Sequence, residues 1–418
     1  MKKFKRLIIA ICVGITILFA RCFMPKANGI TVIWENGIKN TKKYSEGKDI
    51  LNKHNFFIST SSSRDDSDIF IFKGKDYYQS YSDALIKLKE KNLILWAIPK
   101  ELSNITPKKN KIIASYHKTS RIDKAWEEYE VTGKGINIAI MSDGVDVGHP
   151  DLASHIFTNT EEKFDNKDSD KNGVADDVFG YNFIDDNPHT TPKKVGNSPL
   201  IKKLGLYDNQ GTMSAGIISA IASNSKIVPI KIFSGKKGQS FSENIVIKAV
   251  NYASKLKNVK IIVMPWGMSS ENVRLKDLIQ TIQKKYNTIF ICPAGNTKNK
   301  VLFPANMKET IAVGMVESNI KPGDQHVDIY APGKNIPTTN PRYSSSNNDE
   351  ESLLYTNYSG SCAASCIVGG IVALMCEKNP HLDVHMVQEI LKSTSSNGIV
   401  DAKAAIAKVV KDLRKSNK

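Results

Sequence analysis

The sequence is poor in cysteine and has no dense run of charge. Only six cysteines occur in 418 residues, and no two of them form a CxxC pair, so neither a cysteine-based metal site nor a disulfide framework is expected. The net charge of +16 comes mostly from scattered lysines, and no nucleic-acid-binding module is recognisable. We therefore expect buried free thiols, a solvated basic surface and no nucleic-acid partner.

Internal repeats and low-complexity tracts are also absent. Hydrophobic residues make up 41% of the chain and charged residues 24%, which is typical of a globular protein with an ordinary core. A length of 418 residues is too great for one average domain. Two folded units are expected.

The N-terminal 29 residues have the composition of an export signal. Basic residues precede an apolar run from Leu7 to Ala20, the pattern of a secretory signal peptide. That run is short for a membrane-spanning helix, but residues 7–24 together could anchor the chain. Cleavage and anchoring are both open, and either predicts an extracellular or cell-surface protein.

Residues 30–101 alternate between short apolar runs and polar segments. Strands are predicted over Ile30–Trp34, Asp68–Phe72 and Leu93–Ile98, with a helix over Tyr81–Glu90 and polar loops between the first two strands. This pattern predicts a small α+β domain. A lysine-rich linker over 102–121 separates it from the rest.

The second region, 122–418, alternates buried-type strands with helices. The predicted strands are 136–141, 227–233, 260–264, 288–292 and 310–316, and the predicted helices are 211–222, 243–256, 275–285, one starting at Cys362, 383–392 and 402–413. Strands that are apolar on both faces and separated by helices predict a mainly parallel sheet covered on both sides. The fold class is therefore α/β, a three-layer sandwich.

Three segments of this region carry motifs. The first reads INIAIMSDGVDVGHPDL (136–152), the second NQGTMSAGIISA (209–220) and the third NYSGSCAASCIVGGIVALM (357–375). They resemble, in order, the segments that hold the catalytic Asp, His and Ser of the subtilisin-like serine proteases (subtilases, peptidase S8). The resemblance extends over about residues 122–408 and implies a subtilisin-like fold.

The resemblance also implies that no residue of the Asp-His-Ser triad is intact. The three triad positions hold Ser142, Gln210 and Cys362. A glutamine amide cannot accept a proton near neutral pH, so it cannot act as the general base. Asp143 follows the first position directly, but successive side chains of an extended segment point to opposite faces. We expect its carboxylate to point away from the site.

Cys362 leaves an alternative open. A thiolate is a strong nucleophile, and a helix N-terminus can lower the pKa of a thiol, so Cys362 could serve a cysteine-type endopeptidase. No aligned histidine or carboxylate remains to act as its base. Asn296, in TIFICPAGN (288–296), keeps the family's oxyanion-hole position, although an asparagine after glycine is also a good turn residue.

The segment KIIVMPWGMSS (260–270) aligns with the family strand that lines the substrate cleft. Val263, Pro265 and Trp266 replace the usual residues there. Because Pro265 has no backbone N–H, it removes one donor from the strand edge that pairs with an extended peptide. Substrate binding is expected to differ from that of the active relatives.

Residues 168–177 read DSDKNGVADD, with oxygen ligands at alternate positions and Gly173 at the turn. This pattern resembles a calcium loop, and the alternative is a solvated acidic turn. The usual glutamate at the twelfth position is Phe179. Ca²⁺ is the expected cofactor, and the expected ligand residues are Asp168, Asp170, Asn172, Val174, Asp176 and Asp177.

These features favour an exported subtilisin-like pseudoprotease that binds a protein partner, either an active subtilase or a peptide ligand. The upstream domain, 30–101, resembles a subtilase propeptide, which an inactive chain is expected to retain. The rival interpretations are a peptidase that uses Cys362 and a calcium-stabilised surface protein.

Overall fold

The computed structural model describes residues 29–34, 41–61, 67–73, 84, 88, 94–99, 114–149, 151–162, 167–192, 209–234, 242–297, 300–318, 326–341 and 354–416. Residues 1–28 of the predicted export signal (1–29) and most of the predicted helix at 81–90 lie outside these residues. The chain divides into two units, Met1–Lys108 and Lys109–Lys418, and the division falls within the predicted linker.

The first unit contains a four-stranded antiparallel sheet of order β2-β3-β1-β4. Its strands are β1 (Gly29–Trp34), β2 (Phe56–Ser61), β3 (Ser67–Phe72) and β4 (Ile94–Pro99), and helix α2 (Lys42–Lys53) precedes β2. The prediction of polar loops between the first two strands was therefore wrong.

Local signals explain that error. Helix α2 begins after Thr41, whose hydroxyl accepts a hydrogen bond from the Tyr44 N–H, as a helix cap requires. Tyr44, Ile50 and Leu51 form its buried face. These few apolar residues are widely spaced among lysines, so the helical period was not recognised.

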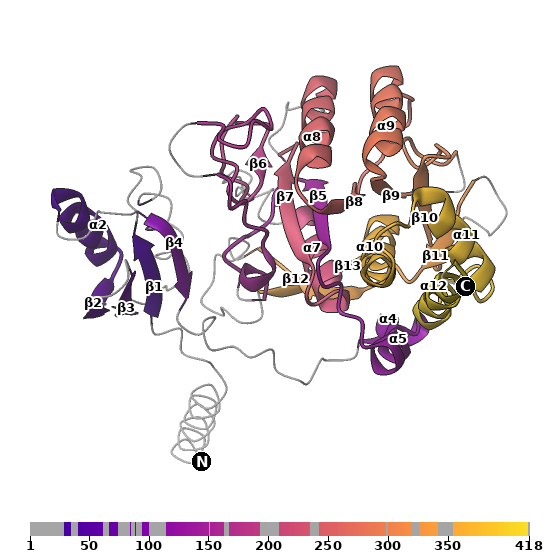
Figure 1. The fold of residues 1–418 in the computed structure, drawn as a ribbon, viewed down its shortest axis with the longest axis horizontal. Coiled ribbons are helices and arrows are strands. Elements are labelled where there is room, and N and C mark those ends of the chain that lie inside the picture. The colour runs from indigo at the N-terminus through magenta and orange to yellow at the C-terminus, as the bar shows by residue number, and fades with distance from the viewer. Residues whose placement is uncertain are drawn as a thin grey trace, which may run out of the picture. The chain divides into compact units, whose positions relative to one another are not determined.

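The second unit is built on a seven-stranded parallel sheet of order β11-β10-β9-β8-β5-β7-β6 (Figure 1). The strands are β5 (Asn137–Ser142), β6 (Tyr181–Asn182), β7 (Lys226–Lys231), β8 (Val259–Val263), β9 (Ile289–Pro293), β10 (Thr310–Met315) and β11 (Ile329–Ala331). The predicted α/β class and the parallel sheet are confirmed.

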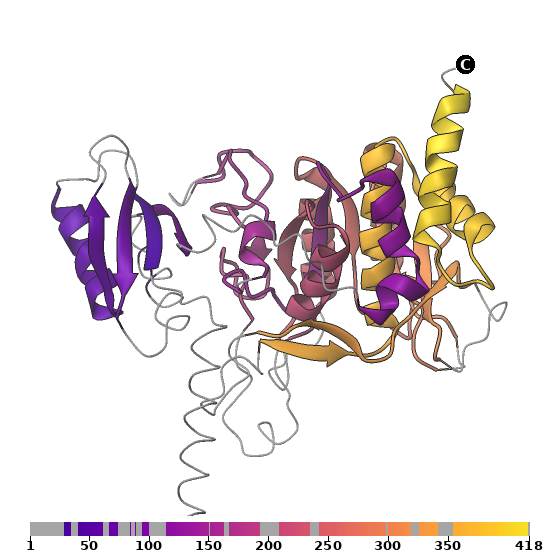
Figure 2. The same ribbon diagram turned by 90° about the horizontal axis from the view of Figure 1, so that it is seen from below.

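Helices cover both faces of this sheet. Helices α7 (Gln210–Ile221) and α10 (Ser361–Lys378) pack on one face. On the other face α8 (Glu243–Lys255) and α9 (Val273–Tyr286) form a core with the strands. Helix α10 is almost wholly buried, because the sheet lies on one side of it and α7 and α12 (Ala402–Ser416) contact it elsewhere (Figure 2).

Smaller elements complete the unit. Helices α4 (Ser115–Thr119) and α5 (Ile122–Tyr129) lead into β5, and α5 packs against α12. Helix α11 (Val384–Thr394) lies between α10 and α12 in the chain, and a short 3-10 helix spans Ala153–His155. Strands β12 (Ile336–Thr339) and β13 (Tyr355–Tyr358) form a separate antiparallel pair that contacts α7.

Among the described residues, α10 is the one helix long and apolar enough to cross a membrane. Most of it, 83%, is buried inside the second unit. A central helix of a large α/β domain is enclosed on all sides and therefore has this composition. Its apolar character is explained by the core.

Candidate functional site

The parallel sheet brings the three triad positions toward one end of the fold. Ser142 is the last residue of β5, Gln210 is the first residue of α7, and Cys362 lies in the first turn of α10. In parallel sheets the carboxyl ends of the strands and the N-termini of the following helices meet at one edge, where α/β proteins bind ligands. The Oγ atom of Ser142 donates to Oε1 of Gln210 over 3.3 Å.

Gln210 is held by its side-chain amide. Its Nε2 group donates to the carbonyl oxygen of Pro265 over 2.7 Å and to the Tyr358 hydroxyl over 2.9 Å. With Oε1 accepting from Ser142, both ends of the amide are bonded. Gln210 therefore acts as a structural bridge between β5, the segment after β8 and β13, and it has no basic atom to offer.

Asp143 binds the backbone of α7. Its two carboxylate oxygens accept from the N–H groups of Gln210, at 3.1 Å, and Gly211, at 2.7 Å. Asn209 precedes the helix, but its side chain makes no cap hydrogen bond. Asp143 therefore satisfies the unpaired amides of the helix N-terminus, where a negative charge is also favourable.

The thiol of Cys362 is protonated at neutral pH. Burial raises its pKa to about 11, although a hydrogen bond with Tyr358 partly opposes this rise. The Tyr358 hydroxyl cannot serve as a base in its place, since burial raises its own pKa well above the usual value. A nucleophilic cysteine needs a lowered pKa or an adjacent base. The described residues around Cys362 supply neither.

Asn296 is engaged with α10. Its Oδ1 atom accepts from the Ser361 N–H over 2.7 Å, and its Nδ2 group lies beside Gly360. Gly360 precedes the helix with φ 131°, a conformation that favours glycine. The side chain of Asn296 thus stabilises the start of α10, and its amide nitrogen is the end that a ligand oxygen could approach.

The segment after β8, which aligns with the family strand that lines the substrate cleft, is packed against its neighbours. The Trp266 indole is buried and donates to the carbonyl oxygen of Met141 over 2.8 Å, one residue before Ser142. The Pro265 carbonyl accepts from Gln210, and its nitrogen has no hydrogen. This residue therefore has no free backbone donor for an extended ligand.

Sequence reasoning missed two residues of this site, Tyr358 and Leu302. Tyr358 contacts both Gln210 and Cys362, yet a tyrosine on a short strand gives no motif that would reveal this. Leu302 is half-buried beside Gly267 and Gly295. Its position depends on three segments that are distant in sequence.

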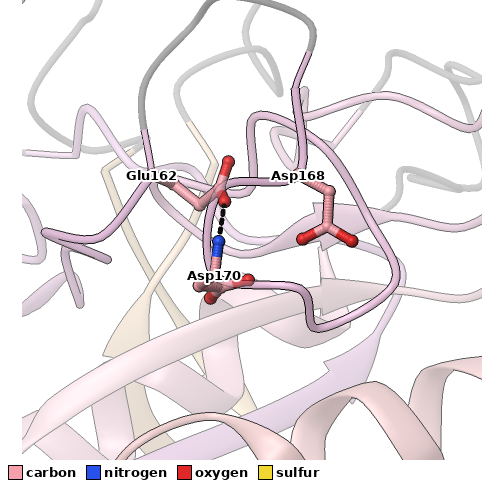
Figure 3. A group of neighbouring side chains, drawn as sticks. All are labelled: Glu162, Asp168 and Asp170. Carbon is pink, nitrogen blue, oxygen red and sulfur yellow. Dashed lines mark hydrogen bonds between the residues drawn. The ribbon is translucent and has the colours of Figure 1, made fainter.

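The acidic loop forms a compact cluster with a residue from outside it. Single carboxylate oxygens of Glu162, Asp168 and Asp170 lie within 4.8 Å of one another (Figure 3). Glu162 accepts from the N–H groups of Ser169, Asp170 and Asp176. Sequence reasoning missed Glu162, since it precedes the loop and no calcium-loop spacing includes it.

The remaining predicted ligands have two kinds of surroundings. Asn172 bridges the loop, because its Nδ2 group donates to Asp170 and Asp177. Asp177 is fully buried and accepts from the Tyr252 hydroxyl over 2.6 Å. Burial raises the pKa of Asp177 to about 6. It anchors the loop to α8, whereas Glu162, Asp168 and Asp170 form the oxygen-rich part that suits a hard cation.

Val174 and Asp176 were predicted as further ligands of this loop. The N–H of Val174 donates to Oδ1 of Asn172 over 3.0 Å, and that of Asp176 donates to Glu162. Both bonds hold the turn of the loop around Gly173, which has φ 105°. The loop is therefore ordered by Asn172 from within it and by Glu162 from the segment before it.

The family follows from the sequence comparison. Residues 133–410 match the model of the subtilase family, peptidase S8. The chain belongs to the subtilase family. The match covers the sheet, all three triad positions and the helices around them.

Individual relatives are distant. The chain is 28% identical over 265 residues to the major intracellular serine protease of Bacillus subtilis, covering 59% of this chain and 69% of that protein. It is 26% identical to subtilisin-like protease 1 of Plasmodium vivax, covering 61% of this chain but only 43% of that protein. The chain thus spans less than half the length of the Plasmodium relative.

Solved structures show the same fold. Fervidolysin from Fervidobacterium pennivorans, a keratinolytic enzyme related to subtilisin, gives a TM-score of 0.53 at 18% identity and covers 91% of this chain and 61% of that one. A protease from Pseudoalteromonas arctica gives 0.51 at 22% identity, with 69% and 98% covered. The predicted subtilisin-like fold is confirmed.

Proposed function

We propose that this subtilase is a pseudoprotease that binds polypeptides without hydrolysing them. The observation that carries the proposal is the environment of Gln210. An amide stands where the family has its general base, and both of its ends are bonded to Ser142, Pro265 and Tyr358. Acyl transfer needs a group that takes the nucleophile's proton and returns it to the leaving amine, and a glutamine can do neither.

The thiol of Cys362 supports the same conclusion. With a pKa of about 11, only about one thiol in ten thousand is ionised at pH 7. Nucleophilic cysteines of peptidases are activated by a nearby histidine or a lowered pKa. Here the neighbouring hydroxyl belongs to Tyr358, which is itself a very weak acid.

We further propose that the protein is exported, that it keeps its N-terminal unit attached, and that its acidic loop binds Ca²⁺. The export signal expected over residues 1–29 supports a place outside the cell or on its surface, where an acidic loop of this kind would meet millimolar calcium. The partner is a polypeptide, either a peptide ligand or an active subtilase, because the relatives named above are proteases and therefore act on polypeptides.

Hydrolysis of a fluorogenic casein by the full-length protein tests the first part. Wild type and the C362A variant should both give the rate of the buffer blank. A triple variant, S142D/Q210H/C362S, rebuilds the family triad and serves as the control for a competent fold. Turnover in wild type that disappears in C362A would replace the proposal with the rival function, an endopeptidase with Cys362 as nucleophile.

Binding is tested separately by crosslinking. The purified protein with a photoreactive group at the exposed Tyr355 position, the first residue of β13, should capture an unfolded polypeptide such as reduced casein. The matched control carries the group at Val273, which is exposed on α9. Equal capture at the two positions would show that the site face does not bind polypeptides.

A further inference from the structure

Helix α12 carries a row of side chains along one face near its C-terminal end. Ala407 and Val410 come first, and Lys411, Arg414 and Lys415 follow. Residues three and four positions apart lie on the same side of a helix. These five residues therefore form a continuous row that is apolar at its start and cationic at its end.

A cavity lies along this row, where α12 packs against α5 (Figure 1). It has a volume of about 450 Å³ and is lined by the five residues of the row and by Glu128 and Tyr129, the last two residues of α5. Tyr129, Ala407 and Val410 are half-buried, whereas the cations of the row are exposed. The cavity is therefore large enough for one or two side chains of a ligand, and it has an apolar part and a charged part.

The charges of the lining are not balanced. Glu128 is its one acidic residue, and both carboxylate oxygens are already engaged: one pairs with Lys403 over 2.6 Å, and the other accepts from the Tyr129 hydroxyl over 2.7 Å. Among the residues that the structure describes, none forms an ion pair with the three cations of the row. The lining therefore has a surplus of positive charge.

Arg414 lies close to the aromatic part of the lining. The hydrogen bond to Glu128 is the main cause of the raised pKa of Tyr129, and the positive charge of Arg414 partly opposes this rise. An exposed charge acts on a neighbour in this way only over a short distance. One ligand could therefore contact the guanidinium group, which suits carboxylates, and the tyrosine ring together.

Basic residues in the last turn of a helix also have an ordinary role, since they stabilise its negative end. Helix α9 gives a comparison within the same unit, because its last turn holds Lys284 and Lys285, followed by Tyr286. These residues do not line the cavity. What distinguishes α12 is thus the combination of unbalanced cations with a cavity that has an apolar part.

We propose that the cavity between α5 and α12 is a docking site for an acidic segment of a partner polypeptide. One apolar side chain of that segment would contact Tyr129, Ala407 and Val410, and its carboxylates would pair with the cations of the row. Charge complementarity selects an acidic partner, which the net charge of +16 also attracts. The apolar part of the lining argues against a bare polyanion, and the concave shape argues against a membrane surface. The site contains none of the triad positions, so the inference goes beyond the proposed function and does not depend on it.

The test measures peptide binding to the full-length chain with the C362A substitution, so that the result is independent of any hydrolysis by Cys362. The probes are fluorescein-labelled Glu-Glu-Phe-Glu-Glu and Glu-Glu-Gly-Glu-Glu, and the readout is the Kd from fluorescence anisotropy. The Phe peptide should bind about tenfold more tightly, which corresponds to about 1.4 kcal/mol, because its ring is removed from water. Raising the salt concentration should weaken both peptides.

Charge reversal separates the cavity from the basic surface in general. The R414E/K415E variant should raise the Kd of the Phe peptide about tenfold, because it reverses two cations of the lining. The matched control, K284E/K285E, makes the same change in the last turn of α9 and should leave the Kd within about twofold. The neutral variant R414Q/K415Q serves if circular dichroism shows that R414E/K415E does not fold, and it should give a smaller change in the same direction.

The A407F variant tests the apolar part without altering the charge. Its added ring should fill the cavity, so it should weaken the Phe peptide and leave the Gly peptide unchanged.

Three results would overturn the inference. The first is a change in Kd that is equal in the two charge-reversed variants or absent from both. The second is equal binding of the two peptides, no effect of A407F on the Phe peptide, or no binding of the Phe peptide at all. The third is binding of phosphatidylglycerol vesicles or polyphosphate through Arg414 and Lys415 more tightly than the Phe peptide, since the partner would then be a phosphate surface. The casein assays of the proposed function are read separately from each of these results.

Discussion

The pH dependence of Cys362 alkylation gives a direct test of the site. Iodoacetamide reacts with the thiolate, so the rate follows the ionised fraction of the thiol. Burial raises the pKa from 9.0 to about 11, which lowers the ionised fraction at pH 7 about 100-fold relative to an ordinary cysteine. The rate should rise about tenfold for each pH unit between pH 7 and 10.

Peptide mapping by mass spectrometry is the assay, because it separates Cys362 from the other cysteines. Cys12 and Cys22, near the N-terminus, are replaced by serine to remove background labelling. Cys292 is the internal control, since it is buried and burial alone raises its pKa. It should react even more slowly than Cys362.

A rate that is already on a plateau between pH 6 and 8 would refute this reasoning. Such a plateau means that the thiol has a low pKa and therefore a base or a cation close by. The protein would then have an activated nucleophile, which would favour the interpretation of the chain as a peptidase that uses Cys362.

Three further predictions concern the acidic loop and the N-terminal unit. Calcium at 1 mM should raise the free energy of unfolding by about 2.7 kcal/mol if Kd is about 10 µM, and E162Q should reduce the shift in melting temperature; an unchanged temperature argues against a structural site. The Asp177 carboxyl, with its pKa raised from 3.8 to about 6, stabilises the fold fully below pH 3.8 and loses this contribution as the pH rises through 6. In EDTA, wild type should therefore lose about 2 kcal/mol relative to D177N between pH 4 and 7, as urea unfolding can measure, whereas parallel curves would contradict it. Finally, the purified chain should migrate on a denaturing gel without a cut near residue 105, because under the proposed function it cannot release its own N-terminal unit; two fragments would count against this.

The sequence predicted most of the second unit because its elements carry strong signals. Strands such as β5 and β9 are apolar on both faces, and helix α10 begins directly after a glycine, Gly360, within a recognisable motif. Element type therefore followed from pattern alone. Helix α2 was missed because its apolar residues are few and lie among lysines. Strand β2 reads FFISTS, and its three consecutive apolar residues followed by polar ones show no two-residue period.

The site was predictable only where one residue type decides the chemistry. Gln210 excludes a general base regardless of its neighbours. The contacts of Tyr358, Glu162 and Leu302 depend on segments that are far apart in the chain. No local spacing encodes such contacts, so the structure was needed to find them.

The two hydrogen bonds of Asp143 have a consequence for rebuilding the family triad in this chain. Its carboxylate binds the first amides of α7, so a variant with aspartate at position 142 would have two carboxyl groups side by side in a buried place. One of them would have to be neutral. The S142D substitution alone therefore leaves one carboxyl protonated at this place, whereas replacing Asp143 as well removes two hydrogen bonds that hold the start of α7.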